Sequence, residues 1–322
     1  MTAATTRKPA ATRRHIFFFI GVSTQGSSIM KVFPRWTELL GLEATIVGYD
    51  APLHAPPPSY RRIVQRLRDD PYACGALITT HKIDLLNATG DLFDELDRYA
   101  ELLGEVSCIS KRQEKLLGSA KDPVSSGLAL QEFLTPGYWA RSGGQVLCLG
   151  AGGAAVAIST YLATRPDPAD RPARFTAVDI DAERLEYLRE LHDRLGNTLP
   201  LESVPGGDPR QVGELVSALP KRSLVINATG MGKDRPGSPV SDEAVFPEGG
   251  LVWELNYRGA LDFYRQAMRQ RQARQLHIED GWRYFLHGWT QALAEVFGFE
   301  LTPALFGRLE QLASAFRPTQ HA

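Results

Sequence analysis

One stretch, Leu149-Gly150-Ala151-Gly152-Gly153-Ala154-Ala155, decides the fold of this chain. An apolar run precedes it and an alanine-rich run follows it, which is the strand–turn–helix context of a dinucleotide-binding turn. In this pattern Gly150 permits the tight turn, Gly152 lets the backbone approach a pyrophosphate, and Ala155 allows the helix to pack closely on the strand. The amino end of the helix adds partial positive charge toward the phosphates. The predicted cofactor-binding residues here are Gly150, Ala151, Gly152, Gly153 and Ala154.

Two acidic residues follow the turn at about the distance where an acidic residue binds the ribose of the cofactor. Asp179 closes the next apolar run, 175–179, and Asp181 lies two positions beyond it. A carboxylate there suits hydrogen bonds to ribose hydroxyls and repels a 2′-phosphate, which favours NAD over NADP. Arg184 is the nearby cation that argues for NADP. The alternative is a tight turn that binds nothing. A later apolar run is followed by two further residues that we expect to contact the cofactor through backbone groups, Asn227 and Thr229.

Length and composition describe an ordinary globular protein. The 322 residues suit two domains that each bury a core, and 43% of them are hydrophobic and 23% charged. The net charge of −1 indicates neither a nucleic-acid nor an acidic-membrane partner. We therefore expect a small-molecule substrate and a monomer or homodimer. The three cysteines have no paired spacing, which fits reduced thiols in a cytoplasmic protein, and no residue cluster has metal-ligand spacing.

The amino-terminal segment is polar and basic, and we expect residues 1–14 to form a disordered tail. Arg13 and Arg14 resemble the start of a twin-arginine export signal, but the apolar run 16–22 is short for such a signal and lacks a small-residue cleavage site. That run also makes a good first strand. No apolar run approaches the length of about 20 residues that spans a bilayer.

Strand and helix signals alternate along the chain, which predicts a mostly parallel α/β architecture. In the first half we expect strands at 16–22, 44–49 and 75–79, helices at 30–40, 59–68, 91–103 and 125–134, and a hairpin of 106–110 with 115–118. In the second half we expect strands at 145–149, 175–179, 223–227 and 251–255, and helices at 154–163, 282–297 and 303–316. The predicted domains are a substrate-binding catalytic domain at 15–135, a Rossmann domain at 136–280, and C-terminal helices at 281–322 that return to the first domain.

Lys82 lies just past the end of an apolar strand, in Ile78-Thr79-Thr80-His81-Lys82, well upstream of the glycine turn. Asp122 follows 40 residues later, before a predicted helix. Taken alone, these are a surface lysine and an aspartate at the start of a helix. A lysine in one domain and a nicotinamide cofactor in the next is also the layout of a two-domain dehydrogenase.

The order of six short segments resembles the shikimate/quinate dehydrogenase family. The family patterns V-T-x-P-[HF]-K, G-A-V-N-T, G-x-N-T-D, G-x-G-G-A-A, V-x-N-A-T and V-x-D-x-x-Y correspond to residues 77–82, 104–108, 118–122, 150–155, 225–229 and 252–257. The resemblance extends in one colinear order over roughly residues 16–316. It implies an N-terminal α/β substrate domain, a doubly wound Rossmann domain, and C-terminal helices that pack back on the first. It also implies a nicotinamide cofactor and a shikimate- or quinate-like substrate, as in aromatic amino acid biosynthesis.

By this resemblance Lys82 and Asp122 are the catalytic pair. Oxidation of a ring hydroxyl needs a group that accepts its proton while hydride leaves for the nicotinamide, and carbonyl reduction needs the same group to donate. A lysine whose pKa is lowered in a closed cleft can do both, and a neighbouring carboxylate orients it.

The departures from the family patterns concentrate where the family holds its substrate. The second serine of H-S-x-S-P falls on Ile29, the polar residues before the catalytic lysine align with Ala76 and Ile78, and the asparagine of G-A-V-N-T is Ser107. A site that loses such donors loses affinity for a polyol, so we expect a substrate other than shikimate itself. Alternatively, a shifted local alignment lets Thr79 and Ser28 replace the missing groups. The candidate substrate contacts are Ser27, Ser28, Thr79, Thr80, Ser107, Tyr257 and Gln291.

Two other functions remain open at this point. The first is a cofactor-binding regulator or pseudoenzyme without turnover, which the altered substrate residues favour and the retained Lys82 and Asp122 oppose. The second is a related lysine-using dehydrogenase that acts on a one-carbon folate-type cofactor, which the Asp122 segment disfavours.

Overall fold

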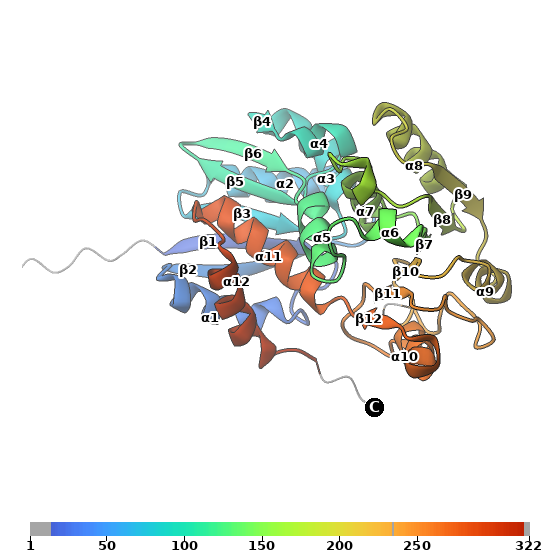
Figure 1. Cartoon of the computed structure of the whole chain (residues 1–322). Helices are drawn as coiled ribbons and strands as arrows, with labels where there is room; N and C mark the ends of the chain where they lie inside the picture. The colour runs from blue at the N-terminus through green and yellow to red at the C-terminus, as the bar shows by residue number, and fades with distance from the viewer. Residues whose placement is uncertain (1–13, 234, 319–322) are drawn as a thin grey trace, which may run out of the picture. The chain divides into compact units, whose positions relative to one another are not determined.

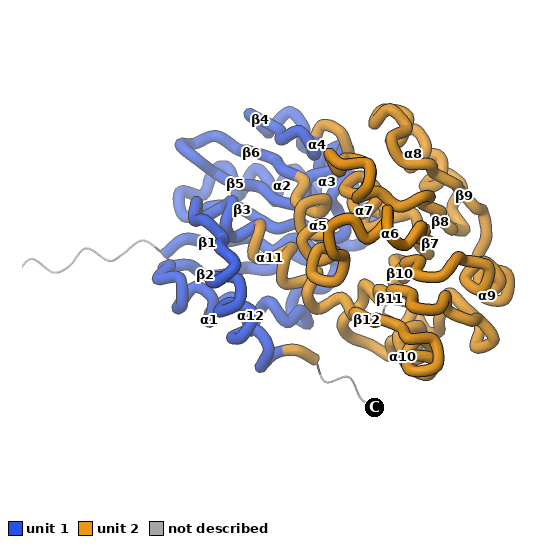
Figure 2. The backbone as a smooth tube through the Cα atoms, viewed as in Figure 1, with its two compact units in different colours: residues 1–100, 104–119, 292–316 blue, residues 101–103, 120–291, 317–322 orange. Residues whose placement is uncertain are grey.

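The computed structural model describes residues 14–233 and 235–318, in alternating strands and helices (Figure 1). The chain forms two compact units, coloured separately in Figure 2. Unit 1 comprises residues 1–100, 104–119 and 292–316, and unit 2 comprises residues 101–103, 120–291 and 317–322. All of the expected amino-terminal tail except Arg14 lies outside the described residues.

Unit 1 is built on a six-stranded mixed sheet in the order β2-β1-β3-β5-β6-β4. Its strands are β1 (His15–Gly21), β2 (Ala44–Asp50), β3 (Ala73–Ile78), β4 (Glu95–Leu96), β5 (Cys108–Arg112) and β6 (Lys115–Ser119). The first three run parallel, and β5 runs antiparallel to both β3 and β6. Residues 17–20 of β1 are buried on both faces of the sheet, as in an inner parallel strand. The predicted strands and hairpin of this half are confirmed.

The helices of unit 1 include a segment from the far end of the chain. They are α1 (Ile29–Leu40), α2 (Pro57–Asp69), α3 (Lys82–Thr89), the short η1 (Gly90–Leu92), the start of α4 (Arg98–Leu103), the end of α11 (Trp282–Phe297), and α12 (Pro303–Ser314). Trp36 of α1 is fully buried, and its Nε1 donates a hydrogen bond to the carbonyl of Leu309 in α12 at 2.7 Å. The predicted return of the C-terminal helices to the first part of the chain is therefore confirmed.

The predicted helix at 91–103 is wrong. The chain there forms a single short turn, then β4, and only from Arg98 the helix α4. Asp94 explains the difference, because its N–H donates to the carbonyl of Leu116 at 2.9 Å and its carboxylate accepts from the Leu116 N–H at 2.8 Å. Asp97 then caps α4 by accepting from the Ala100 N–H. Pairing with β6 thus overrides the local helical pattern.

Unit 2 contains a six-stranded sheet in the order β12-β11-β10-β7-β8-β9, and all of its strands are parallel. The strands are β7 (Val146–Leu149), β8 (Phe175–Asp179), β9 (Leu201–Pro205), β10 (Leu224–Asn227), β11 (Leu251–Glu254) and β12 (His277–Glu279). Counted from β7, this is the doubly wound order 3-2-1-4-5-6 of a Rossmann sheet. The order reverses between β7 and β10, so ligands are expected at the carboxyl ends of those two strands. The predicted fold class is confirmed.

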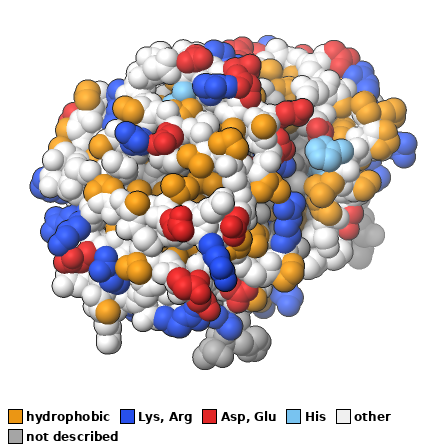
Figure 3. All heavy atoms as spheres, turned by 90° about the vertical axis from the view of Figure 1, so that its right-hand side faces the viewer, with side chains coloured by type: hydrophobic (Ala, Val, Ile, Leu, Met, Phe, Trp, Pro, Cys, Tyr) orange, Lys and Arg blue, Asp and Glu red, His pale blue; other side chains and the backbone are white. Residues whose placement is uncertain are grey.

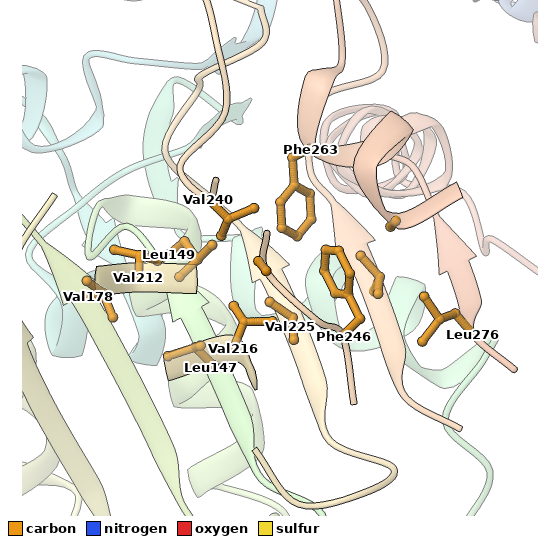
Figure 4. Close-up of a cluster of buried hydrophobic side chains, with 13 residues drawn as sticks. Leu147, Leu149, Val178, Val212, Val216, Val225, Val240, Phe246, Phe263 and Leu276 are labelled. Carbon is orange, nitrogen blue, oxygen red and sulfur yellow. The ribbon is translucent and has the colours of Figure 1, made fainter. Parts of the chain in front are cut away.

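Helices cover both faces of this sheet, as the doubly wound order requires. They are α5 (Asp122–Gln131), α6 (Tyr138–Ser142), α7 (Gly153–Ala163), η2 (Pro168–Asp170), α8 (Ala182–Arg194), α9 (Pro209–Ser217), α10 (Asp262–Arg274) and the first part of α11. Figure 4 shows a core cluster of thirteen buried residues, to which Val212 of α9, Phe263 of α10 and Val225 of β10 all belong. Each such side chain contributes about 1.5–3 kcal/mol by leaving water.

Charges of both signs are mixed on one face of the molecule. On the face shown in Figure 3, Lys and Arg side chains are interspersed with Asp and Glu. Within residues 14–233 and 235–318, no helix combines the length and the hydropathy that crossing a bilayer demands.

His192 of α8 makes the stability of the protein depend on pH. It is 1% exposed, and burial lowers its pKa below the ordinary 6.5, which the Leu199 main chain only partly offsets. The unfolded chain therefore binds a proton there more readily, so this stability is present above about pH 6.5 and is lost as the pH falls. We expect urea unfolding between about pH 7 and pH 5 to show a smaller loss of stability in His192→Leu than in the wild type. His54→Gln, at a side chain 84% exposed, is the matched control. An unchanged pH dependence in His192→Leu would contradict this account.

Candidate active site

The glycine turn packs backbone to backbone against the turn that follows β10. Gly150 has a φ of 105°, a left-handed conformation that favours glycine. A Cβ at Gly150 would lie 2.8 Å from the carbonyl oxygen of Ala228, and the Ala228 N–H donates to the carbonyl of Leu149 at 2.7 Å. The two turns at the switch point of the sheet therefore hold each other in place.

The residues at the start of α7 are partly exposed. Gly152, Gly153 and Ala154 are half-buried, whereas Ala155 is fully buried under the helix. A Cβ at Gly152 would meet nothing nearer than a guanidinium nitrogen of Arg184 at 4.0 Å. The N–H groups of a first helical turn have no partner within the helix, so this surface fits a pyrophosphate.

Asp179 links β8 to the glycine turn. Its carboxylate is largely buried, and its Oδ2 accepts from the N–H of Ala151 at 2.6 Å while Oδ1 accepts from the N–H of Asp181 at 2.9 Å. A carboxylate offers about four acceptor positions, so two remain for further donors such as ribose hydroxyls. Asp179 thus has a structural role that the sequence did not predict, in addition to the predicted one.

Asp181 caps α8 and pairs with Arg184, the nearby cation that argues for NADP. Its Oδ1 accepts from the N–H groups of Glu183 and Arg184, and its Oδ2 lies 3.3 Å from Nε of Arg184. The side chain between the two aspartates, Ile180, is 74% exposed. The rim of the glycine turn therefore carries two carboxylates, one guanidinium and an exposed apolar side chain.

The side chain of Asn227 is committed to contacts inside the protein. It is fully buried, and its Oδ1 accepts from the N–H and the hydroxyl of Thr229 at 3.1 and 2.7 Å. Its Nδ2 donates to Glu254 Oε2 at 2.7 Å. These bonds occupy the side chain, and the expected contact of Asn227 with a cofactor through its backbone stays a prediction.

Glu254, at the end of β11, is a functional candidate that the sequence reasoning missed. It is fully buried, its Oε1 accepts from both the N–H and the Nδ2 of Asn256, and burial raises the pKa of its carboxyl group to about 8. The signal was present, since an acidic residue that closes an apolar run at the carboxyl edge of a parallel sheet lies where ligands bind.

In unit 1, three strand ends meet at Lys82. Lys82 is half-buried and begins α3, four residues after β3 ends. Its carbonyl accepts from the N–H of Val106 at 3.3 Å. Ser107, next to it, accepts from the N–H of Ile78 at 2.8 Å and donates its own N–H to Ser119 at 3.0 Å. The carboxyl ends of β3 and β6 and the amino end of β5 therefore converge on the lysine.

The predicted polar contacts of unit 1 follow the same edge of the sheet. Thr79 donates its hydroxyl to the carbonyl of Ile20 at the end of β1, at 3.3 Å, and Ser28 precedes α1 without a side-chain capping bond. Ser107 is almost fully buried, while Ser27, Ser28 and Thr79 are half-buried and Thr80 is exposed. Lys82 thus has hydroxyl groups on the neighbouring strand ends.

In unit 2, an ion-pair cluster joins the helix of Asp122 to that of Gln291. Asp122 is the first residue of α5, and Glu132 follows the last. The Glu132 carboxylate accepts from Arg283 at 2.5 and 2.6 Å and from His287 Nε2 at 2.6 Å, both on α11. Burial opposes ionisation, but the bonds from His287 and Arg283 hold the pKa of Glu132 below its ordinary value. Gln291 lies one helical turn beyond His287.

Tyr257 packs on the same helix. Its ring lies 4.7 Å from that of Phe285 and 5.5 Å from that of Trp282, measured between centroids. Within the part of the chain that the structure describes, no cluster of three or more His, Cys, Asp or Glu side chains is arranged to hold a metal ion.

Sequence comparison finds curated dehydrogenases. No family model matches the chain. A shikimate dehydrogenase (NADP(+)) of Streptococcus gordonii is 31% identical over 178 residues, which are 55% of this chain and 58% of that protein. The chain thus spans little more than half the length of the curated relatives it matches.

Solved structures with the same fold cover nearly the whole chain. A shikimate dehydrogenase in complex with NADP+ has a TM-score of 0.73 and 17% identity, covering 98% of this chain and 100% of that one. The quinate dehydrogenase from Corynebacterium glutamicum in complex with NAD has a TM-score of 0.72 and 18% identity, covering 94% and 99%. A 5-ketofructose reductase of Gluconobacter sp. strain CHM43 has a TM-score of 0.67 and 20% identity, covering 94% and 100%. Together the comparisons support the resemblance to the shikimate/quinate dehydrogenases.

The two hydrogen bonds that Asp179 accepts make its replacement costly for the fold. Asp179→Ala leaves the N–H groups of Ala151 and Asp181 without their acceptor, and we expect the free energy of unfolding to fall by about 1–3 kcal/mol. Asp179→Asn retains one acceptor oxygen and is expected to lie between Ala and the wild type. Urea denaturation followed by circular dichroism measures this order. Equal stability of Asp179→Ala and the wild type would show that the carboxylate does not hold the glycine turn.

Proposed function

We propose that this protein is a shikimate/quinate dehydrogenase-like oxidoreductase that transfers hydride between NAD and a hydroxyl or carbonyl group of a small carbocyclic acid. The observation that carries the proposal is the convergence of three strand ends of unit 1 on Lys82. The doubly wound sheet with its open glycine turn supports the cofactor, and the curated relatives support the class of reaction.

The proposed partner of Lys82 is Asp122. Asp122 follows Ser119 by three residues, so the extended length of the chain limits the distance between their Cα atoms to about 11 Å. Ser119 itself accepts the N–H of Ser107, beside the segment bonded to Lys82. The chain that leads to Asp122 therefore starts beside the segment bonded to Lys82, which supports the proposed pairing.

The proposed chemistry uses the two side chains at the starts of their helices. Lys82 is the first residue of α3, and its amine is the proposed group that exchanges the proton. Asp122 is the first residue of α5, and its carboxylate can accept a hydrogen bond from the substrate hydroxyl and so orient it. NAD supplies the hydride acceptor when bound. Lys82 takes the hydroxyl proton in oxidation and returns it in reduction.

The rim of the glycine turn supports NAD over NADP. A 2′-phosphate would meet the carboxylates of Asp179 and Asp181, and the guanidinium of Arg184 is already paired with Asp181. The relatives point to both cofactors, since the Streptococcus gordonii protein is named for NADP(+) and the quinate dehydrogenase holds NAD.

The proposed substrate differs from shikimate in its polar groups. Ala76 and Ile78, which occupy the places of two polar residues of the family pattern, are buried in β3 and offer no side-chain donor. The remaining polar contacts are the hydroxyls of Ser27, Ser28 and Thr79, together with Ser107, Tyr257 and Gln291. The 5-ketofructose reductase shows that this fold also occurs in a reductase named for a keto sugar. We therefore place related carbocyclic acids with other polar groups ahead of shikimate itself.

The catalytic proposal is tested by measuring the reduction of NAD+ to NADH, and separately of NADP+ to NADPH. The substrates are shikimate, quinate and amino-cyclitol acids. We expect turnover with NAD+ that falls by about 10²–10⁴-fold in Lys82→Ala, because general acid–base catalysis contributes about that much. Lys115→Ala is the control, since Lys115 is an exposed residue paired with Glu95 on the surface of unit 1.

Three results would reject it. Equal rates in Lys82→Ala and Lys115→Ala would remove Lys82 from the chemistry. Calorimetric binding of NAD without turnover of any compound would favour the regulator, and turnover of methylene-pterin substrates would favour the folate-type dehydrogenase.

Asp181 gives a separate prediction on cofactor choice. Asp181→Asn keeps an oxygen that can cap α8 but removes the charge that neutralises Arg184. We expect the ratio of KM for NADP+ to KM for NAD+ to fall by about tenfold, equivalent to about 1.4 kcal/mol. Asp193→Asn on the same helix serves as the control. An unchanged ratio would mean that Arg184 does not reach the 2′ position.

A further inference from the structure

Both carboxylate oxygens of Glu254 accept hydrogen bonds from the protein. It is fully buried, its Oε2 accepts from Asn227 Nδ2 at 2.7 Å, and its Oε1 accepts from the N–H and the Nδ2 of Asn256 at 2.8 and 2.7 Å. An ionised carboxylate accepts only, so these bonds suit the charged form. A protonated carboxyl group must also donate, and none of these three partners can receive its hydrogen.

The orientation of the Asn227 amide is fixed from its other side. Its Oδ1 accepts from the N–H and the hydroxyl of Thr229, so its Nδ2 must point toward Glu254. The hydroxyl of Thr229 in turn accepts from the N–H of Met231 at 3.1 Å. The carbonyl of Met231 accepts from the amides of Asn227 and Asn256 at 3.3 and 3.0 Å. Glu254 thus anchors both asparagines, and they anchor the turn 228–231.

This turn is the one that lies against the glycine turn. The carbonyl oxygen of Ala228 occupies the space where Gly150 would carry a Cβ, at 2.8 Å. Because the two backbones are in contact, a change in the turn 228–231 is transmitted to the surface that faces the cofactor.

We propose that Glu254 is a positioning residue for the cofactor site and that proton uptake by its carboxyl group loosens the turn 228–231. The cofactor part of this inference rests on the proposed function. A proton on Glu254 needs an acceptor, which the Asn227 amide supplies by rotating its Oδ1 toward the carboxyl group. The rotation takes the acceptor away from the N–H and the hydroxyl of Thr229 and the donor away from the carbonyl of Met231, so the turn loses these bonds. NAD binding therefore weakens as the pH falls through the titration of Glu254.

The charged surroundings place this titration in an accessible range. The pKa of Glu254 is raised to about 8, with burial as the largest cause. The hydrogen bonds from Asn256 and Asn227 oppose this rise, and Asp280, which follows the neighbouring strand β12, adds a smaller upward contribution. The Asp280 carboxylate in turn accepts from Arg317. On α10, burial raises the pKa of Tyr264 above its ordinary value, and Asp280 adds to that shift. The partners from β10 and the segment after β11, Asn227 and Asn256, do not titrate.

Hydrogen exchange tests the loosening without cofactor or substrate. We expect the backbone amides of residues 228–232 to exchange at least tenfold more slowly in the wild type than in Glu254→Gln at about pH 9, and at similar rates at about pH 6. Comparison at one pH cancels the intrinsic exchange rate. In Glu254→Gln an amide N–H₂ group takes the place of the acid proton, so the turn 228–231 should stay loose at both pH values. Glu248→Gln, at an exposed residue paired with Lys221, is the matched control and should behave as the wild type.

Calorimetric titration with NAD over the same range tests the link to the cofactor. We expect the dissociation constant for NAD to fall about tenfold from pH 6 to pH 9 in the wild type and in Glu248→Gln. In Glu254→Gln it should stay as high at pH 9 as at pH 6. Should Glu254→Gln fail to fold, Glu254→Asp keeps a titrating carboxyl group and should retain the step.

The outcomes separate this inference from the proposed function. The inference would be overturned if the amides of residues 228–232 exchanged equally fast in the wild type and in Glu254→Gln at about pH 9. It would also be overturned if Glu254→Gln showed the same pH-dependent change in exchange as the wild type. An exchange step in a protein that binds no NAD would support the loosening and reject the proposed cofactor.

Discussion

The contact between the backbone of Gly150 and the carbonyl of Ala228 is the constraint on which unit 2 depends. It joins the turns after β7 and β10, the two strands between which the order of the sheet reverses. Only a residue without a Cβ fits at this contact, and only glycine adopts its φ of 105° without strain. Asp179 secures one side of the contact through Ala151, and Glu254 secures the other through Asn227. Buried carboxylates thus shape a surface that phosphates would approach.

Much of the fold could be predicted because apolar runs and glycine positions carry local information. The strand 175–179 and the helix 282–297 have the predicted bounds, since Asp179 closes the apolar run of the strand and apolar residues mark both ends of the helix. The segment 91–103 could not be predicted, because the bonds between Asp94 and Leu116 join residues that are distant in the sequence. The helix that begins at Lys82 was also missed, since its eight residues are too few for a clear periodic pattern.

The candidate site could be predicted in its backbone but not in its polar network. A glycine pattern states where a phosphate fits, whereas the sequence gives no sign that Asp179 also bonds the glycine turn or that Glu132 receives both Arg283 and His287. Such bonds depend on which strands and helices are neighbours in the folded protein, and local sequence patterns do not predict that. The predicted positions of Lys82 and Asp122 as a pair rest on the resemblance and on the chain that connects them, and they stay a prediction.

The bond from Trp36 to Leu309 has a consequence for how the protein folds as it is synthesised. Residues 120–291 of unit 2 form one continuous stretch, so its core has all of its strands before the last helix leaves the ribosome. Unit 1 begins with β1 but needs α12, whose residues are translated almost 300 positions later, to cover α1 and complete the burial of its tryptophan. The part of the chain made first is therefore the part completed last. Until then α1 exposes apolar surface of the kind that chaperones bind during translation.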